Sequence, residues 1–421
     1  MMNYQDLKKE LQEEIRGRLD MSRELADEEI GEIIDSVILE RSHREYMSAM
    51  TKLSLRQELF NAIRRLDIVQ ELIDRPDITE VMINGCEAIF YEKGGHIYTW
   101  DKRFESREKL EDVIRQIVSR SNRQVNESVP IVDATLADGS RVNVVLDPVA
   151  INGPILTIRK FAEDPIVMED LIRWESITRE AADYLKTLVR SGYNIFVSGA
   201  TSTGKTTFLN VLADYIPKGE RVITIEDSAE LQLHDIPNLV RLEVRQNALE
   251  SGGNVTIRDL IKTSLRMRPD RIIVGEVRGE EALDMIQSMN TGHQGSLSTG
   301  HANSCRDALS RLETMVLMGS DMPLAAIRKQ IASSIDIVVQ LGRLRDKSRR
   351  VMEITEVLGC EGDGYVLNPL FVFREETDVV RESVSYNGQS ADRVRGRLTR
   401  TGQHLRRREK LAAAALERDE L

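Results

Sequence analysis

The sequence is poor in cysteine and in aromatic residues. Its three cysteines, Cys86, Cys305 and Cys360, are widely separated and form no C-x-x-C pair. This odd, scattered set disfavours a disulfide framework and a thiolate zinc site, and it is typical of reduced thiols in the cytoplasm. Aromatic residues make up 5% of the chain, which argues against a protein that stacks single-stranded bases.

Positive charge and long apolar runs are also lacking. The formal net charge is −11, so the chain as a whole is not a polyanion binder, and no direct contact with nucleic acid is expected. No apolar run approaches the roughly 18 residues that a membrane-spanning helix requires. The first residues, MMNYQDLKKELQEE, are charged and have a helical pattern, unlike a signal peptide. We therefore expect a cytoplasmic protein without a transmembrane segment, whose role at a membrane would be peripheral or through partners.

Changes in sequence texture predict four regions. Residues 1–75 carry leucine and isoleucine at helical spacing, which predicts an N-terminal helical region. Residues 76–163 contain short strand-like runs, hairpin signals and one amphipathic helix, which predict a small mixed α/β domain. Residues 164–390 predict the largest domain, with a hinge at Asp164-Pro165. Residues 391–421 predict an Arg-rich tail.

The largest region alternates between apolar strands and amphipathic helices. The segments NIFVSG, RVITIED and RIIVGEV are strand-like, and helical patterns separate them. Such alternation predicts an α/β domain whose mostly parallel sheet carries helices on its faces.

A glycine-rich loop follows the first of these strands. The pattern G-x-x-x-x-G-K-[ST] runs from residue 199 to residue 206, between a strand and a helix, which is the context that a phosphate-binding loop requires. Backbone N–H groups of such a loop surround phosphates, while Lys205 would reach the β- and γ-phosphates and Thr206 would offer its hydroxyl to Mg²⁺. The predicted nucleotide-binding residues are Gly199, Ala200, Thr201, Ser202, Thr203, Gly204, Lys205, Thr206 and Thr207.

Two acidic positions follow later strands. Glu226, with Asp227, ends the strand RVITIED, and Glu276 follows the strand RIIV. Ligands of parallel sheets bind at the carboxyl ends of the strands, so these carboxylates are candidates to hold the metal or to orient and deprotonate water. The alternative for each is a solvated surface carboxylate. Which of the two acts as the base stays open.

Two of the six histidines lie in the segment NTGHQGSLSTGHANS. His293 and His301 are eight residues apart among glycines, a spacing that is not a zinc-ligand pattern. A role near the phosphates fits better, with His301 or His293 sensing a γ-phosphate. The alternative for each is a structural histidine.

Together, the segments GATSTGKT, TIEDSAEL, RPDRIIVGEVRG and TGHQGSLSTGHAN resemble the Walker A, Asp box, atypical Walker B and His box of the secretion ATPases, which power type II and type IV secretion and type IV pili. The stretch from about 75 to 345 is similar to that family. The stretch TIRDLIKTSLRMRPDRIIVGEVRGEEALDMIQSMNTGHQGSLSTGHANSCRDALSRLETMVLMG is most similar to the CpaF/TadA branch, which drives Tad (Flp) pilus assembly.

The resemblance implies a fold, a reaction and an assembly. It implies a RecA-like P-loop ATPase domain preceded by a PAS-like domain, ATP and Mg²⁺ as cofactors, and a homo-hexameric ring that acts on inner-membrane platform proteins. Arginines from outside the loop would stabilise charge on the phosphates. Residues matching such arginines are Arg141, Arg159, Arg241 and Arg245. The alternative for each is an ordinary surface ion-pair residue.

Rival functions remain open. The absence of C-x-x-C pairs disfavours branches that carry a tetracysteine zinc module, and the conjugation-type type IV secretion ATPases remain the nearest rival to the CpaF/TadA branch. A nucleotide-dependent switch without turnover and a RecA-like DNA motor are rivals from other classes. Low aromatic content and negative charge disfavour the DNA motor.

Overall fold

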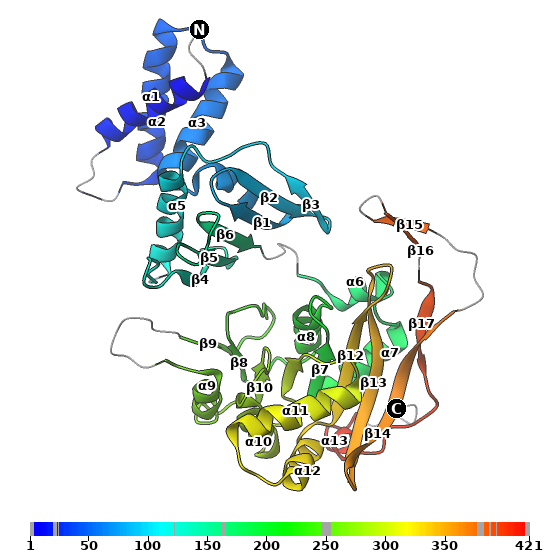
Figure 1. The fold of residues 1–421 in the computed structure, drawn as a ribbon. Helices are drawn as coiled ribbons and strands as arrows, with labels where there is room; N and C mark the ends of the chain where they lie inside the picture. The colour runs from blue at the N-terminus through cyan, green and yellow to red at the C-terminus, as the bar shows by residue number, and fades with distance from the viewer. Residues whose placement is uncertain are drawn as a thin grey trace. The chain divides into compact units, whose positions relative to one another are not determined.

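A computed structural model describes residues 4–19, 23, 25–121, 123–160, 165–245, 254–376, 383–386, 389–392 and 394–416. The chain divides into two compact units, Met1–Glu163 and Asp164–Leu421 (Figure 1). Among the described residues, no helix has both the length and the apolar character needed to cross a membrane.

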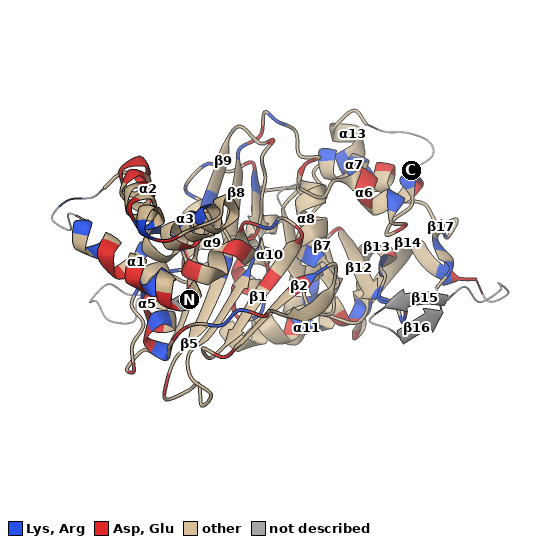
Figure 2. Ribbon diagram, turned by 90° about the horizontal axis from the view of Figure 1, so that it is seen from above, with Lys and Arg blue, Asp and Glu red and all other residues tan. Residues whose placement is uncertain are grey.

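The first unit begins with three helices, α1 (Tyr4–Arg18), α2 (Asp27–Arg44) and α3 (Ala49–Arg64). Their apolar stripes pack into one core that includes Leu11, Ile15, Ile34, Leu55 and Leu59. Figure 2 shows Lys and Arg interspersed with Asp and Glu along these helices. Because the two signs alternate, the charges pair across the bundle, as in the 2.7 Å contact between Arg18 and Glu40.

The rest of this unit is an antiparallel sheet with a helical cover. The six strands lie in the order β3-β2-β1-β6-β5-β4. Alternate residues of β4, β5 and β6 face a core shared with α5, because successive side chains point to opposite faces of a strand. The elements are η1 (Asp67–Val69), α4 (Gln70–Ile73), β1 (Ile78–Asn84), β2 (Ala88–Lys93), β3 (His96–Thr99), α5 (Arg107–Arg120), β4 (Ile131–Thr135), β5 (Arg141–Val145) and β6 (Ile155–Arg159).

The second unit is built on a nine-stranded sheet in the order β17-β14-β13-β12-β7-β11-β10-β8-β9. The strands from β12 to β9 in this order are parallel, and β13, β14 and β17 are antiparallel to their neighbours. The strands are β7 (Ile195–Gly199), β8 (Val222–Glu226), β9 (Leu239–Glu243), β10 (Arg271–Val274), β11 (Leu297–Gly300), β12 (Ile337–Arg343), β13 (Arg349–Glu361), β14 (Gly364–Glu375) and β17 (Gly396–Arg400).

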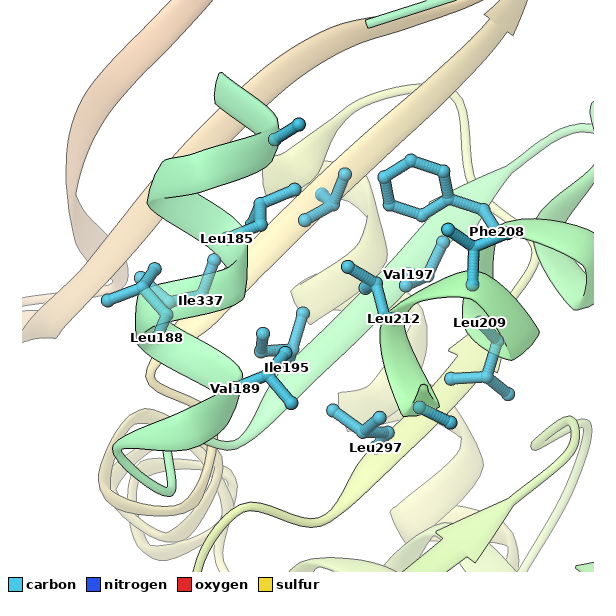
Figure 3. Packing of buried hydrophobic residues seen from close by; sticks show 14 of the residues in the cluster. Leu185, Leu188, Val189, Ile195, Val197, Phe208, Leu209, Leu212, Leu297 and Ile337 are labelled. Carbon is cyan, nitrogen blue, oxygen red and sulfur yellow. The ribbon is translucent and has the colours of Figure 1, made fainter. Parts of the chain in front are cut away.

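Helices cover both faces of this sheet. The helices of the unit are α6 (Met168–Arg173), α7 (Arg179–Arg190), α8 (Lys205–Ala213), α9 (Ile257–Ser264), α10 (Glu281–Asn290), α11 (Cys305–Gly319), α12 (Leu324–Ser334) and α13 (Glu409–Ala413). Figure 3 shows Leu185 and Leu188 of α7 and Leu212 of α8 packed against Ile195 and Val197 of β7. Phe196, which lies between Ile195 and Val197 on β7, packs in a second core with residues of α9 to α12. The expected mostly parallel sheet with helices on its faces is confirmed.

The C-terminal segment is part of the second unit. We expected residues 391–421 to form a separate tail, but β17 pairs with β14 in the main sheet. Leu405 and Leu411 are buried in the core beneath α7. A short hairpin of β15 (Ser383–Tyr386) and β16 (Gln389–Asp392) precedes β17.

Candidate active site

The predicted phosphate loop connects β7 to α8 in a tight wrap. A Cβ atom added at Gly199 would lie 2.6 Å from Oγ1 of Thr203 and 2.8 Å from the carbonyl oxygen of Leu341, so only glycine fits. Ser202 and Gly204 have positive φ angles of 62° and 91°, which reverse the chain before the helix. The first N–H groups of a helix have no partner within it, so the loop presents donors suited to an anion. Thr206 and Thr207 lie in this first turn.

Lys205 reaches back over the loop from the start of α8. Its Nζ donates to the carbonyl oxygen of Ala200 at 3.2 Å and lies 3.2 Å from Nδ1 of His301. Burial lowers the pKa of Lys205, although the nearby carboxylate of Glu276 opposes this effect. Lys205 is therefore partly buried at the site, and its two contacts are with uncharged groups that phosphate oxygens can replace.

His301 links this lysine to Glu276. Because Lys205 can only donate, Nδ1 of His301 accepts and the proton of the neutral ring stands on Nε2. That atom is 2.6 Å from Oε1 of Glu276. Burial lowers the pKa of His301, and the charges of Lys205, Arg278 and Arg311 lower it further, against the opposing effect of Glu276.

The two carboxylate oxygens of Glu276 have different surroundings. Oε2 accepts from Arg278 at 2.8 Å, and Arg278 also lies 3.7 Å from Asp227. Oε1 is buried and, despite its closeness to His301, completes no hydrogen bond of normal geometry among the described residues. A buried carboxylate oxygen without a full partner is costly and marks a place where another donor, such as water, can bind.

Glu226 is held differently. It ends β8, is 4% exposed, and its Oε2 accepts from the backbone N–H groups of Glu230 and Leu231 at 2.8 and 2.9 Å. A Cβ atom added at Gly275 would lie 2.9 Å from Cγ of Glu226, so the side chain packs tightly under the start of the Glu276 loop. These contacts hold the Glu226 carboxylate between the loop that follows β8 and the backbone at Gly275.

Strand order explains why these residues meet. The phosphate loop follows β7, His301 follows β11, Glu276 follows β10 and Glu226 ends β8, and these four strands are consecutive neighbours in the sheet. Since all four run parallel, their carboxyl ends lie along one edge. The sequence order of the motifs gave no indication of this spatial order.

The structure does not bring His293 to this edge. His293 precedes β11, so it lies at the amino end of the strand, whereas His301 follows the carboxyl end. Its Nδ1 is 3.3 Å from the carbonyl oxygen of Ser288, and its own carbonyl oxygen accepts from Ser296. The expectation of a phosphate-sensing role for His293 is therefore corrected to a structural role within this unit.

The predicted arginines belong to two different parts of the chain. Arg241 is on β9, the outermost strand, and Arg245 follows it in a bridge with Val255; β8, β10 and β11 separate β9 from β7. Arg141 and Arg159 belong to the first unit, where they are direct partners across β5 and β6. Arg141 and Arg159 are therefore neighbours on the sheet of the first unit.

Sequence reasoning missed several residues beside the site. The sequence could have indicated Arg278, because it lies two residues after Glu276. A pocket of about 600 Å³ next to the loop is lined by Ala200, Thr201, His301, Ala302, Asn303, Asp307, Ser310, Arg311 and Thr314. Its α11 residues recur at the spacing of one helical face, which a helical-wheel inspection would have found. Among the described residues, no group of three or more His, Cys, Asp or Glu side chains could hold a metal ion.

Comparison with known proteins places this site in a family. A family model described as type II/IV secretion system protein matches residues 63–404. The conjugal transfer protein TrbB of Rhizobium radiobacter is 30% identical over 312 residues, covering 73% of this chain and 92% of TrbB. The type IV secretion system protein PtlH of Bordetella pertussis (strain Tohama I) is 31% identical over 321 residues, covering 69% of this chain and 93% of PtlH.

A solved structure agrees in fold. The pilus retraction motor PilT with bound ADP has a TM-score of 0.52 at 19% identity, covering 72% of this chain and 81% of PilT. This likeness supports the RecA-like P-loop ATPase fold. The family-level resemblance to secretion ATPases is confirmed, and the chain belongs to the type II/IV secretion system protein family.

Proposed function

We propose that this protein is a Mg²⁺-dependent ATPase that works as a hexameric motor. The observation that carries the proposal is the array of Lys205, His301 and Glu276 beside a loop that only glycine can wrap. The loop residues Gly199 to Thr207 would hold the phosphates, and Thr206 and Glu226 would hold Mg²⁺ through the nucleotide. Bound Mg²⁺ supplies positive charge that stabilises the phosphate oxygens.

In this proposal the residues have separate roles. Lys205 exchanges its contacts with Ala200 and His301 for phosphate oxygens. His301 keeps its Nε2 proton toward Glu276 and so fixes the carboxylate. Glu276 orients water and accepts a proton from it through Oε1, the oxygen that faces Nε2 of His301 without completing a hydrogen bond to it. Glu226 sets the position of the Glu276 loop through Gly275.

The motor part of the proposal rests on the charge that this unit offers the phosphates. Transfer of a phosphoryl group requires positive charge beyond one lysine. Arg141 and Arg159 of the first unit, and Arg241 and Arg245 of the second, would supply it within a subunit or from a neighbour in the ring. Such a requirement ties hydrolysis to movement of whole domains, which is how binding becomes mechanical work.

We further propose that the motor acts from the cytoplasm on inner-membrane platform proteins of a Tad (Flp) pilus. The density of matching motifs in the stretch TIRDLIKTSLRMRPDRIIVGEVRG favours this branch. A conjugation-type type IV secretion ATPase is the second candidate, because TrbB and PtlH carry those descriptions. Neighbouring genes for a pilin, a prepilin peptidase and paired platform proteins would favour the first; co-purification with conjugation components would favour the second.

Rivals from other classes make different predictions. A switch binds nucleotide without turnover, and a DNA motor binds DNA with a strong dependence on salt. The contact between Glu276 and His301 favours ATP turnover over a switch. The charges of the first unit are paired with each other, as in Arg18 with Glu40, and do not favour binding of DNA or RNA.

The test combines steady-state hydrolysis of Mg-ATP with analytical ultracentrifugation of the full chain. We expect turnover whose specific activity rises with protein concentration as a hexamer forms. A chain that binds ATP without turnover would be a switch, and a fully active monomer would remove the ring from the mechanism.

A further inference from the structure

A hairpin far along the chain places an arginine next to the phosphate loop. Strands β12 and β13 are joined by a short turn, and Arg349 is the first residue of β13. A Cβ atom added at Gly204 would lie 3.7 Å from Cδ of Arg349. The aliphatic part of the Arg349 side chain therefore lies beside Gly204, the residue that immediately precedes α8.

Arg349 has no partner among the described residues. It is exposed and takes part in no recorded hydrogen bond or ion pair within that part of the chain. Its neighbour Arg350 is the opposite case, because it is buried and contacts both the carboxylate and the carbonyl oxygen of Glu175. Arg350 therefore stabilises the fold, whereas Arg349 makes no stabilising hydrogen bond or ion pair among the described residues.

The surroundings of Arg349 are unfavourable for a cation. Arg343 lies directly opposite it across the two strands, also exposed and without a recorded partner among the described residues. Like charges facing each other on antiparallel strands are destabilising. The start of a helix carries partial positive charge, so α8 adds to this repulsion. An anion at the loop would relieve each of these costs.

We propose that Arg349 binds a phosphate oxygen of the nucleotide, from the same unit as the phosphate loop. This inference rests on the proposed nucleotide site and adds a residue to it. A guanidinium meets phosphate oxygens through paired hydrogen bonds, so Arg349 supplies charge that does not depend on the first unit or on a neighbouring subunit. It contributes to affinity for the phosphate chain and not for the nucleoside.

The test measures binding of fluorescent N-methylanthraniloyl-ADP and of the corresponding adenosine to the full chain. For Arg349→Ala we expect the dissociation constant for the ADP probe to rise roughly 10-fold or more, since a hydrogen bond to a charged group is lost. Affinity for the adenosine probe should be unchanged, and Arg349→Lys should recover part of the loss. Because the side chain is exposed, unpartnered and next to like charge, the thermal midpoint of Arg349→Ala should not fall.

Arg345→Ala is the matched control. Arg345 lies in the same hairpin and carries the same charge, but Glu375 already pairs with it, at 2.9 Å for one of two contacts. We expect its affinity for the ADP probe to stay within about 2-fold of the parent, as for exposed ion pairs. A similar loss in Arg345→Ala would indicate a general charge effect and overturn the assignment.

Three further results would overturn the inference in distinguishable ways. If the parent chain binds and hydrolyses ATP and Arg349→Ala binds the ADP probe equally well, Arg349 is not a phosphate ligand and the proposed function stands. If the parent chain binds no nucleotide, the proposed function fails and this inference fails with it. An equal loss for both probes would assign Arg349 to the nucleoside.

Discussion

Buried polar residues lie at both ends of the parallel sheet, but their hydrogen bonding differs between the two ends. At the amino end, both the backbone and the side chain of Asn194 are hydrogen-bonded: its backbone N–H donates to Asp336, its side-chain N–H to Ser334, and its Oδ1 accepts from Gly295 and Ser296. At the carboxyl end, Lys205 has only neutral partners and Glu276 keeps a buried oxygen without a complete hydrogen bond.

This difference separates structure from function. Buried polar groups that are fully hydrogen-bonded stabilise the fold, whereas a buried group that lacks a complete hydrogen bond can serve to bind a ligand or water. Substitutions at the carboxyl end should therefore change chemistry more than stability, and substitutions at the amino end should do the reverse.

The largest effect is expected for Lys205→Ala. The variant loses the main point charge at the phosphates, and removal of such a group typically lowers turnover by roughly 1000-fold. Steady-state hydrolysis of Mg-ATP measures this, with thermal unfolding as the check on folding. Turnover at the parent rate would place the active site elsewhere in the chain.

Arg159→Ala should have the next largest effect, although it lies in the other unit. We expect activity to fall roughly 100-fold while the ring persists, because a charge at the phosphates is lost without a change at the sheet edge. Hydrolysis assays beside analytical ultracentrifugation test both parts. An unaffected variant would remove Arg159 from the site and leave Arg349 as the arginine to examine.

Asn194→Ala tests the amino end of the sheet. The substitution leaves buried donors and acceptors of Gly295, Ser296 and Ser334 without partners, so we expect the free energy of unfolding to fall by about 3 kcal/mol. Turnover per folded molecule should be close to that of the parent. A large loss of turnover without loss of stability would contradict the separation of the two ends.

The smallest effect concerns pH and His301. The pKa of His301 lies below its ordinary value of 6.5, mainly because of burial. Above 6.5 the ring is neutral in the folded and unfolded chains. As pH falls between 6.5 and the lowered pKa, the unfolded chain binds more protons, so the folded state loses stability. Below the lowered pKa, a proton on Nδ1 would face Lys205 and activity should decline.

The measurement for this prediction is kcat/KM across the acid range, since that ratio reports the free enzyme. We expect a decline in the parent as pH falls through the lowered pKa of His301, and no such decline in His301→Gln. An identical acid limb in both proteins would assign the titration to another group.

The sequence was sufficient for features that depend on local pattern. The loop from Gly199 to Thr206 was predictable because strand, loop and helix are contiguous, and Glu226 and Glu276 because each follows an apolar strand. The two histidines were not separable, since the short strand β11 between them sends them to opposite edges of the sheet. Recognising Leu297–Gly300 as a strand would have distinguished them.

Contacts between distant segments could not be predicted. Arg349 reaches Gly204 only because β12 pairs with β7 and β13 pairs with β12. Likewise, β17 joins the sheet through β14, although its sequence lies in an Arg-rich stretch that suggested a tail. Strand pairing of this kind depends on the whole core, which no local pattern specifies.

The most direct test of the account is single-turnover hydrolysis of Mg-ATP by Glu276→Gln and Glu226→Gln, with nucleotide affinity measured in parallel. Glutamine keeps the shape of the side chain but cannot accept a proton from water. We predict that Glu276→Gln retains affinity and loses hydrolysis, and that Glu226→Gln loses less because its carboxylate supports the neighbouring loop. Parent-like hydrolysis in Glu276→Gln, together with loss in Glu226→Gln, would contradict the assignment of Glu276 as the base.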